Sequence, residues 1–297
     1  MTIDEQVAAL STGRAFCELR GWWTTVVTGA DARSWLGDLV TAAVETLAHG
    51  DAVRSLLLSP TGRMRADFTI AAVAGGFLLV QDPIQPARLE ALLAPYVLSS
   101  DVSLEDRSEE LAVFAFPGHA PRSDKGERYT PSALGAGTDV VVNGSEAHHL
   151  RDAVANLLEV DLDGVETWRI VRGAARFAVD LSEDSLPHEA ALDDAIAYAK
   201  GCFLGQEAVA KVRNLGRPPF VVVALRSDVE VRRGDRIVAR GEEVGAVTSA
   251  ASVSGAWSAI GRVRWAARDA ELRTRSGAAL RSLGPASGAD PKQGARR

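Results

Sequence analysis

The feature that most constrains the fold is a change of sequence pattern at Arg217-Pro218-Pro219. Beyond it, short strand-like runs such as FVVVALR, GEEVGAVTSAASV and SAIGRVRW alternate with glycine turns. Strands at this spacing are typical of a small β-barrel or sandwich. We therefore predict a separate β-barrel over residues 217–283. The last residues, 284–297, are rich in glycine, proline and charge, which predicts a disordered tail.

The first 216 residues mix helix and strand patterns, which predicts an α+β region of two subdomains with a boundary near residues 100–115. TTVVTG is strand-like, ADARSWLGDLVTAAVETL has helical spacing, and SLLLSPTGRMRADFTIAAV reads as two strands joined by a turn. The polar stretch 116–137 is expected to be a surface loop. Further on, we expect one helix ending at Ala199 and another from about Gly205 to Gly216.

Composition excludes several classes of protein. The chain has 33 basic and 39 acidic residues, a net charge of -6, which disfavours direct binding of nucleic acid. The N-terminal segment lacks the features of a secretory signal, and no apolar run is long enough for a membrane helix, so we expect a cytoplasmic protein without a membrane partner. Two cysteines and five histidines, none at metal-ligand spacing, predict reduced thiols and no metal site.

The stretch KGCFLGQE, residues 200–207, carries the main candidate for chemistry. Cys202 is predicted just before a helix N-terminus, where unpaired N–H groups and the nearby Lys200 favour a negative thiolate. The same helix end can instead receive a carboxylate or phosphate of a ligand. A third reading makes Cys202 a small packed residue, as we expect for Cys17, which lies among apolar neighbours.

KGCFLGQE closely resembles the Lys-Gly-Cys-aromatic-x-Gly-Gln-Glu motif of the YgfZ family. VTGADARSWLGDLVT, SPTGRMRADF, WRIVRG, LPHEAALDDAIAYA and GEEVGAVTSAAS are similar to further stretches of that family, so the resemblance covers roughly residues 10–270. These are folate-binding proteins of iron–sulfur protein maturation, related to the glycine-cleavage aminomethyltransferase. The resemblance implies GcvT-like folate domains of ferredoxin-like α/β character around a central opening that holds tetrahydrofolate or a one-carbon derivative of it, capped by the barrel. It also implies partners among iron–sulfur enzymes or their assembly machinery, with links to one-carbon metabolism and tRNA modification.

The resemblance also assigns site residues. Asp67 corresponds to the aspartate that handles a proton at the folate nitrogen, and the two-residue strand period predicts Arg63, Arg65 and Asp67 on one face. The arginines would keep Asp67 ionised or hold the folate glutamate tail, whereas without the family this face reads equally well as a solvated edge. The residues expected to act in chemistry are Cys202, Lys200 and Asp67. Those expected to bind the cofactor are Asp67, Arg63, Arg65, Gln81, Arg169, Gly201, Gly205, Gln206 and Glu207.

Some positions depart from the transferases. Val171 stands where their Arg-x-Glu-x-x-Gly stretch offers an acid to the pterin ring, and their Thr-Asn-Asp run is here Thr41 to Ala43. These losses argue against ordinary aminomethyl transfer. The leading hypothesis is a folate-dependent accessory protein for iron–sulfur enzymes with a working thiol at Cys202, and whether it catalyses a reaction stays open. The alternatives are a tetrahydrofolate-dependent aminomethyltransferase or demethylase, and a folate-binding scaffold without chemistry.

Overall fold

The computed structural model describes residues 1–118, 128–132 and 134–287. The chain forms two compact units, each built from separate stretches of sequence. The sheet unit consists of Ala9–Leu162 and Asp194–Ala208, and the barrel unit consists of Met1–Ala8, Asp163–Asp193 and Val209–Arg297. The chain therefore begins in the barrel unit, forms most of the sheet unit, passes back to the barrel unit, and returns to the sheet unit once before it ends in the barrel unit. We call residues 194–208 the return segment.

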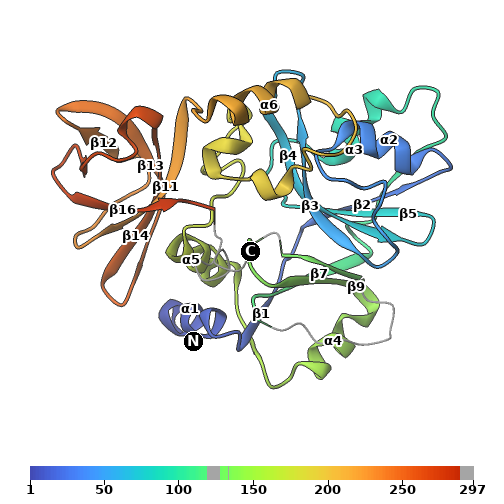
Figure 1. Ribbon diagram of the computed structural model, residues 1–297. Helices are drawn as coiled ribbons and strands as arrows, with labels where there is room; N and C mark the ends of the chain where they lie inside the picture. Colours follow the sequence, from blue (N-terminus) through green and yellow to red (C-terminus); the bar gives the residue numbers. More distant parts are fainter. Residues whose placement is uncertain (119–127, 133, 288–297) are drawn as a thin grey trace. The chain divides into compact units, whose positions relative to one another are not determined.

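The first sheet of the sheet unit is antiparallel, with the order β3-β4-β5-β2-β6. Its strands are β2 (Trp23–Thr28), β3 (Ala52–Leu58), β4 (Met64–Val73), β5 (Gly76–Gln81) and β6 (Ser103–Asp106). Helices α2 (Ala32–Leu39) and α3 (Leu89–Leu93) pack their buried leucines against one face of this sheet (Figure 1). That face carries alternate strand residues such as Phe68, Ile70 and Leu79, as the two-residue period requires.

The second sheet of the same unit has the order β10-β1-β7-β9-β8. Its strands are β1 (Ala15–Glu18), β7 (Leu111–Phe116), β8 (Arg128–Pro131), β9 (Thr138–Asn143) and β10 (Leu158–Glu159). Helix α4 (Ala147–Ala153) covers a core in which the rings of Phe16 and Phe116 stack with centroids 5.5 Å apart. Strand β8 packs against β3 and β4 of the first sheet, so the two sheets meet inside one unit.

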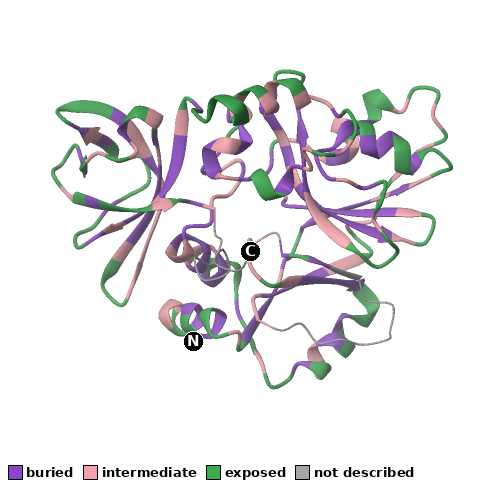
Figure 2. Ribbon diagram, in the orientation of Figure 1, coloured by how far each residue is buried: buried purple, intermediate pink, exposed green. Residues whose placement is uncertain are grey.

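The barrel unit contains a closed six-stranded barrel, in which neighbouring strands run β11-β14-β13-β12-β15-β16. The strands are β11 (Phe220–Ser227), β12 (Arg236–Ala239), β13 (Glu242–Val253), β14 (Ala256–Arg264), β15 (Leu272–Thr274) and β16 (Ala279–Pro285). Their inward side chains are mostly valine, leucine and isoleucine, and Figure 2 shows the buried stretches along the strands. The α+β class and the C-terminal barrel are as predicted, while the central opening stays a prediction.

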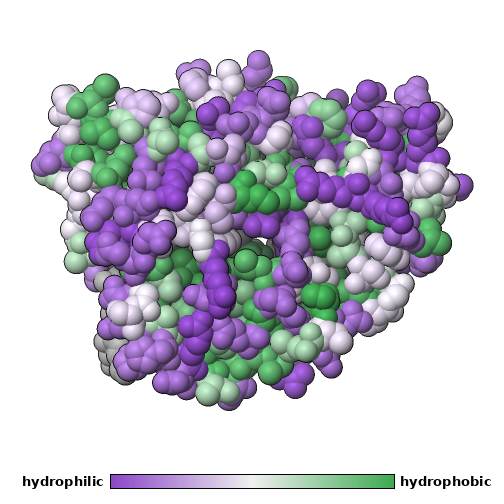
Figure 3. All heavy atoms as spheres, turned by 180° about the vertical axis from the view of Figure 1, so that it is seen from behind, coloured by the Kyte–Doolittle hydropathy of each residue, from purple (hydrophilic) through white to green (hydrophobic). Residues whose placement is uncertain are grey.

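The remaining helical elements are short. They are α1 (Ile3–Ser11), α5 (Leu162–Arg172) and α6 (Gln206–Leu215), and the 3-10 helices η1 (Ala94–Tyr96), η2 (Gly144–Glu146), η3 (Pro187–Ala190), η4 (Asp193–Ala195) and η5 (Trp265–Ala267). In the described part of the chain no helix is long and apolar enough to cross a membrane. The face drawn in Figure 3 mixes hydrophilic and hydrophobic residues.

The predicted helix ending at Ala199 is wrong, because this stretch forms only η3 and η4. Ala191 has a φ of 52°, which breaks any helix there. The return segment instead bonds to Thr41 of the sheet unit: Thr41 Oγ1 donates to the Ala195 carbonyl at 2.7 Å, and the Ala197 N–H donates to the Thr41 carbonyl at 2.9 Å. Tertiary hydrogen bonds therefore replace helical ones. The second predicted helix is confirmed as α6.

Other boundaries also shift. The predicted loop 116–137 contains β8, which pairs with β9, although residues 119–127 and 133 lie outside the described residues. The predicted helix over 30–47 ends at Leu39, since Val40 is extended and bridges to Leu57 of β3. Of the predicted tail, Gly284 and Pro285 belong to β16, and residues 288–297 lie outside the described residues.

Candidate functional site

The motif loop, residues 200–207, is anchored on the end of α2 by Lys200. Its Nζ donates hydrogen bonds to the backbone carbonyls of Gly37, Val40 and Ala42, at 2.6, 2.6 and 2.9 Å. Burial lowers the pKa of Lys200 to about 8, against the attraction of Glu45 and Asp38. The ammonium group thus attaches residues 200–205, which form no helix or strand, to the end of α2. The sequence had indicated only a role for Lys200 beside the thiol.

The motif loop also packs tightly on the turn between β3 and β4. Gly205 has a φ of 82°, and a Cβ placed on it would lie 2.5 Å from the Ser59 carbonyl oxygen and 3.3 Å from the Cα of Gly62. Only glycine fits this close approach without strain. By contrast, a Cβ on Gly201 would meet nothing within 4 Å. The structure therefore brings together three stretches that carried the resemblance: the α2 region, the β3–β4 turn and the motif loop.

Cys202 lies on the exposed side of this loop. Its neighbour Phe203 is buried, and the Lys200 Nζ lies 5.3 Å from the centre of that ring. Helix α6 begins at Gln206, whose N–H donates to the Phe203 carbonyl at 3.1 Å, and Glu207 is exposed on its first turn. The loop thus presents a solvent-accessible thiol four residues before a helix.

Asp67 lies on β4 and is held by an arginine that sequence analysis missed. Arg54 of β3 donates from Nε and Nη2 to the two carboxylate oxygens, at 2.9 and 2.6 Å, a bidentate ion pair. The side chains are 18% and 13% exposed, so the pair is largely shielded from water. Burial alone would lower the pKa of Arg54, but the charge of Asp67, and then that of Asp194 on the return segment, raises it. Arg54 therefore stays charged.

The predicted common face of Arg63, Arg65 and Asp67 is interrupted. Arg63 precedes β4, in the turn, where its N–H donates to the Ser59 hydroxyl at 3.1 Å. The ladder shifts by one residue between Leu57 and Leu58, which leaves Arg65 as the extra residue of a β-bulge. The strict alternation on which the prediction depended fails at this bulge.

Several buried polar atoms of the sheet unit have no partner inside the described chain. Arg54 stands opposite Thr69, and both Thr69 and Thr24 stand opposite Val80, so these side chains and Asp67 share the face away from α2 and α3. The hydroxyls of Thr24 and Thr69 are buried without a hydrogen-bond partner. On β8, which packs against this sheet, the Thr130 hydroxyl is in the same condition. Among the described residues the Nη1 of Arg54 also lacks a hydrogen-bond partner.

Gln81 is occupied within the protein. It is 1% exposed, its side-chain oxygen accepts from the Leu89 N–H at 2.9 Å, and its Nε2 donates to the Ala87 carbonyl at 2.9 Å and to Gln85 at 3.2 Å. Gln85 in turn bonds both backbone groups of Asp67. Gln81 therefore fixes the start of α3 and supports the strand that carries Asp67.

Arg169 belongs to the barrel unit, where it forms a buried cluster with Glu166, Asp180 and Ser249. It makes five hydrogen bonds: two to Glu166, and one each to Asp180, Ser249 and the Ala174 carbonyl. All five guanidinium N–H groups are therefore used. Burial would raise the pKa of Glu166, but Arg169 and Arg176 hold it below its usual range. We call this group the Arg169 cluster; it joins α5 to the barrel strand β13.

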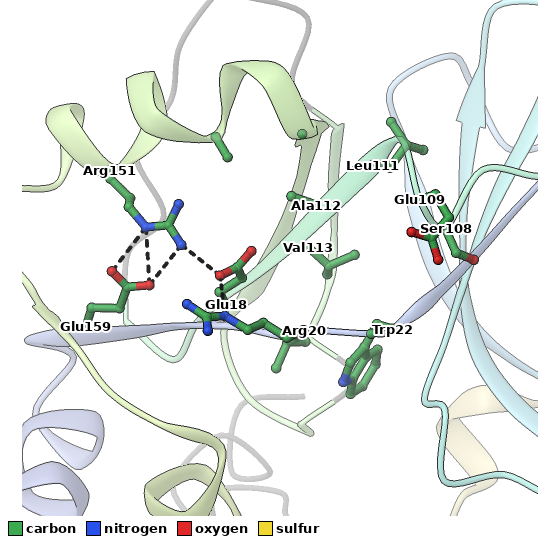
Figure 4. Close-up of a pocket in the computed structure, with 14 residues that line it drawn as sticks. Glu18, Arg20, Trp22, Ser108, Glu109, Leu111, Ala112, Val113, Arg151 and Glu159 are labelled. Carbon is green, nitrogen blue, oxygen red and sulfur yellow. Dashed lines mark hydrogen bonds and ion pairs between the residues drawn. The ribbon is translucent and has the colours of Figure 1, made fainter.

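A separate cavity of about 690 Å³ opens in the sheet unit between β1, β7 and α4 (Figure 4). Arg151 lies on the wall of this cavity and donates hydrogen bonds to Glu18 and Glu159, while Arg20 donates one to Glu18. None of the predicted site residues lines it. Cys17, next to this wall, is buried, and burial followed by the charge of Glu159 raises its pKa to about 12.

Comparisons with known proteins bear on the fold of the chain. Residues 1–125 match the model of the GCVT N-terminal domain. An uncharacterized protein of Haemophilus influenzae is 26% identical over 81% of this chain and 85% of its own length. The aminomethyltransferase of Thermotoga maritima is 22% identical over 84% of this chain and 77% of its own.

The crystal structure of the glycine cleavage system aminomethyltransferase T from Bartonella henselae superposes with a TM-score of 0.79. The likeness covers 97% of this chain and 89% of that structure, at 18% sequence identity. The chain therefore has the GcvT-like fold of the aminomethyltransferases, with mixed α/β sheets and a closed C-terminal barrel.

Proposed function

We propose that this chain is a folate-binding accessory protein of the YgfZ family, which supports assembly or repair of iron–sulfur enzymes with Cys202 as its functional thiol. The motif KGCFLGQE and the GcvT-like fold support the family. The observation that carries the proposal is the accessible Cys202 on a loop packed against the β3–β4 turn, in the hairpin that carries Asp67. The anchoring contacts of Lys200 and Gly205 make them positioning residues.

The face around Asp67 fits a reduced folate. Buried hydroxyls without partners are costly, so those of Thr24 and Thr69, which have none among the described residues and share the face of Asp67, favour a polar occupant there. A tetrahydrofolate, when bound, supplies a one-carbon unit or the nitrogen that accepts one. Asp67 and Arg54 would hold its ring, and Arg63 and Arg65 its glutamate tail, while the sheets exclude water. Arg169 has no donor left for this task.

Cys202 would act at the edge of this site. An accessible thiol can add to an electrophilic carbon or exchange with a disulfide or persulfide sulfur. Either reaction suits a protein that protects or repairs sulfur-containing centres. The tight turn contact at Gly205 keeps the thiol from drifting relative to the β3–β4 hairpin.

Conventional aminomethyl transfer is the second candidate, favoured by the aminomethyltransferase relatives. Two observations weigh against it. Val171 replaces the expected pterin-binding acid, and Asp67 is locked in a bidentate ion pair rather than presented as a free carboxylate. Formation of methylenetetrahydrofolate from a methylamine donor by the purified chain would favour this candidate over ours.

Calorimetric titration of the full chain with tetrahydrofolate under anaerobic conditions tests the cofactor. We expect micromolar binding to the wild type, weaker binding to Asp67→Asn, and unchanged binding to Cys202→Ser. The absence of heat at high micromolar ligand would remove folate from the proposal.

The thiol is tested in cells that lack the protein. We expect the wild type to restore the activity of iron–sulfur enzymes and Cys202→Ser to fail at equal protein level, whereas Cys17→Ala serves as the matched cysteine control. Full complementation by Cys202→Ser would refute the role of the thiol while leaving folate binding intact.

A further inference from the structure

We propose that the Arg54–Asp67 ion pair reads the carbonyl-and-amide edge of the ligand's fused pyrimidine ring, and that Asp67 serves as an anchored acceptor rather than as a base. The inference rests on the proposed function, because it concerns the ring of the same folate. It assigns a recognition role to Arg54, which carried no signal in the motif comparison.

The ion pair keeps part of its hydrogen-bonding capacity. Arg54 uses Nε and Nη2 for the carboxylate, and its Nη1, with two N–H groups, has no hydrogen-bond partner among the described residues. Each carboxylate oxygen of Asp67 can accept a second hydrogen bond. Donor and acceptor thus lie side by side in fixed geometry. A ring carbonyl next to a ring N–H presents the complementary pair.

The surroundings of the pair favour such a ligand. Thr69 stands directly across from Arg54 on the neighbouring strand, and its buried hydroxyl has no partner among the residues that the structure describes. A hydroxyl can donate or accept, so it can follow either group of the ring edge. The side chains of the pair are 18% and 13% exposed, so ligand atoms here would be shielded from competing water.

The same contacts favour a binding role for Asp67. Both of its carboxylate oxygens accept hydrogen bonds from Arg54, so the group is held in one orientation, and its removal would leave the charge of Arg54 shielded from water without its partner. Asp194, the other acid that raises the pKa of Arg54, makes no ion pair with it within the described residues. The arrangement therefore suits binding better than base catalysis.

Affinities for tetrahydrofolate and for its analogue with an amino group in place of the ring carbonyl test this directly. The analogue presents donors to the donors of Arg54, so we expect the wild type to prefer tetrahydrofolate by about tenfold or more. In Arg54→Gln the amide can turn either its oxygen or its nitrogen to the ring, and we expect the preference to fall close to unity.

Arg54→Lys retains a charge beside Asp67, so it tests the inference even where Arg54→Gln does not fold. We expect it to show an intermediate preference. Asp194→Asn is the matched control, which removes a nearby charge without breaking the pair, and it should keep the wild-type preference. An unchanged preference in both arginine variants would overturn the inference. Absence of binding of either compound to the wild type would instead overturn the proposed function.

Discussion

The two units each hold an aspartate with an arginine, but they use the arginine differently. In the barrel unit Arg169 makes five hydrogen bonds to protein groups, and Asp180 is fully buried. In the described part of the sheet unit Arg54 makes two, both to Asp67, and the hydroxyls of Thr24 and Thr69 on the same face find no partner there. A saturated cluster stabilises the fold, whereas a cluster with spare donors and acceptors is suited to a ligand. Saturation, more than burial, is what differs between the two arginines.

The largest expected effect tests the saturated side of this contrast. Arg169→Met leaves Asp180 buried without its counter-charge, which should lower the free energy of unfolding by about 3–5 kcal/mol. Urea unfolding of the full chain measures the loss. Arg232→Met, which removes a fully solvated pair with Glu230, should leave the midpoint unchanged. Equal midpoints for both variants would show that the Arg169 cluster does not stabilise the barrel unit.

Gly205→Ala tests how tightly the motif loop is packed on the β3–β4 turn. The left-handed backbone and the 2.5 Å approach of the new Cβ to the Ser59 carbonyl should cost about 2–4 kcal/mol. Gly201→Ala is the matched control, because open space surrounds its Cβ position. If thermal unfolding shows the two variants to be equally stable, the loop is not packed on the β3–β4 turn.

Lys200→Met asks whether the ammonium holds the loop. Three carbonyl groups, those of Gly37, Val40 and Ala42, would lose their donor, so we expect a loss of about 1–3 kcal/mol in the free energy of unfolding. Lys211→Met, an exposed lysine on α6, is the control and should cost nothing measurable. If Lys200→Met is as stable as this control, the ammonium group does not hold the loop, and only the predicted role of Lys200 beside the thiol would remain.

The smallest expected change in stability, with a large change in reactivity, concerns the two cysteines. Exposed Cys202 should react with a maleimide at pH 7, whereas Cys17, buried and with a pKa raised to about 12, should not. Peptide mapping of the labelled chain distinguishes the two sites, and Cys202→Ser should unfold like the wild type. Preferential labelling of Cys17 would contradict the burial seen here.

The buried Cys17 also makes stability depend on pH. Above pH 9 the unfolded state ionises Cys17 and the folded state does not, so this group lowers the free energy of unfolding as pH rises towards 12.

Periodicity and turn residues predicted the β3–β4–β5 strands, α6 and the barrel, because each of these elements is specified by local sequence. The helix expected to end at Ala199 failed because Thr41, remote in sequence, takes its backbone hydrogen bonds. Local patterns contain no record of such a partner.

The candidate site was predictable to a similar degree. The motif located Cys202, Lys200 and Gly205, but their contacts with α2 and the β3–β4 turn are tertiary. Arg54 had one signal, a lone charge within the apolar run AVRSLLL, in the strand that forms a hairpin with that of Asp67. Nothing in the sequence indicated the β-bulge at Arg65, so the break in alternation along β4 is seen only in the structure.

The return segment has a consequence for biogenesis. Its Lys200, Ala195 and Gly205 complete hydrogen bonds and packing for groups made far earlier in the chain, on α2, Thr41 and the β3–β4 turn. On the ribosome, β7, α4 and α5 are synthesised before the return segment, so these groups lack their contacts until the return segment emerges. The sheet unit therefore completes its folding only after the nascent chain has extended well past residue 162. A chain released before then would lack the return segment that packs on α2 and the β3–β4 turn.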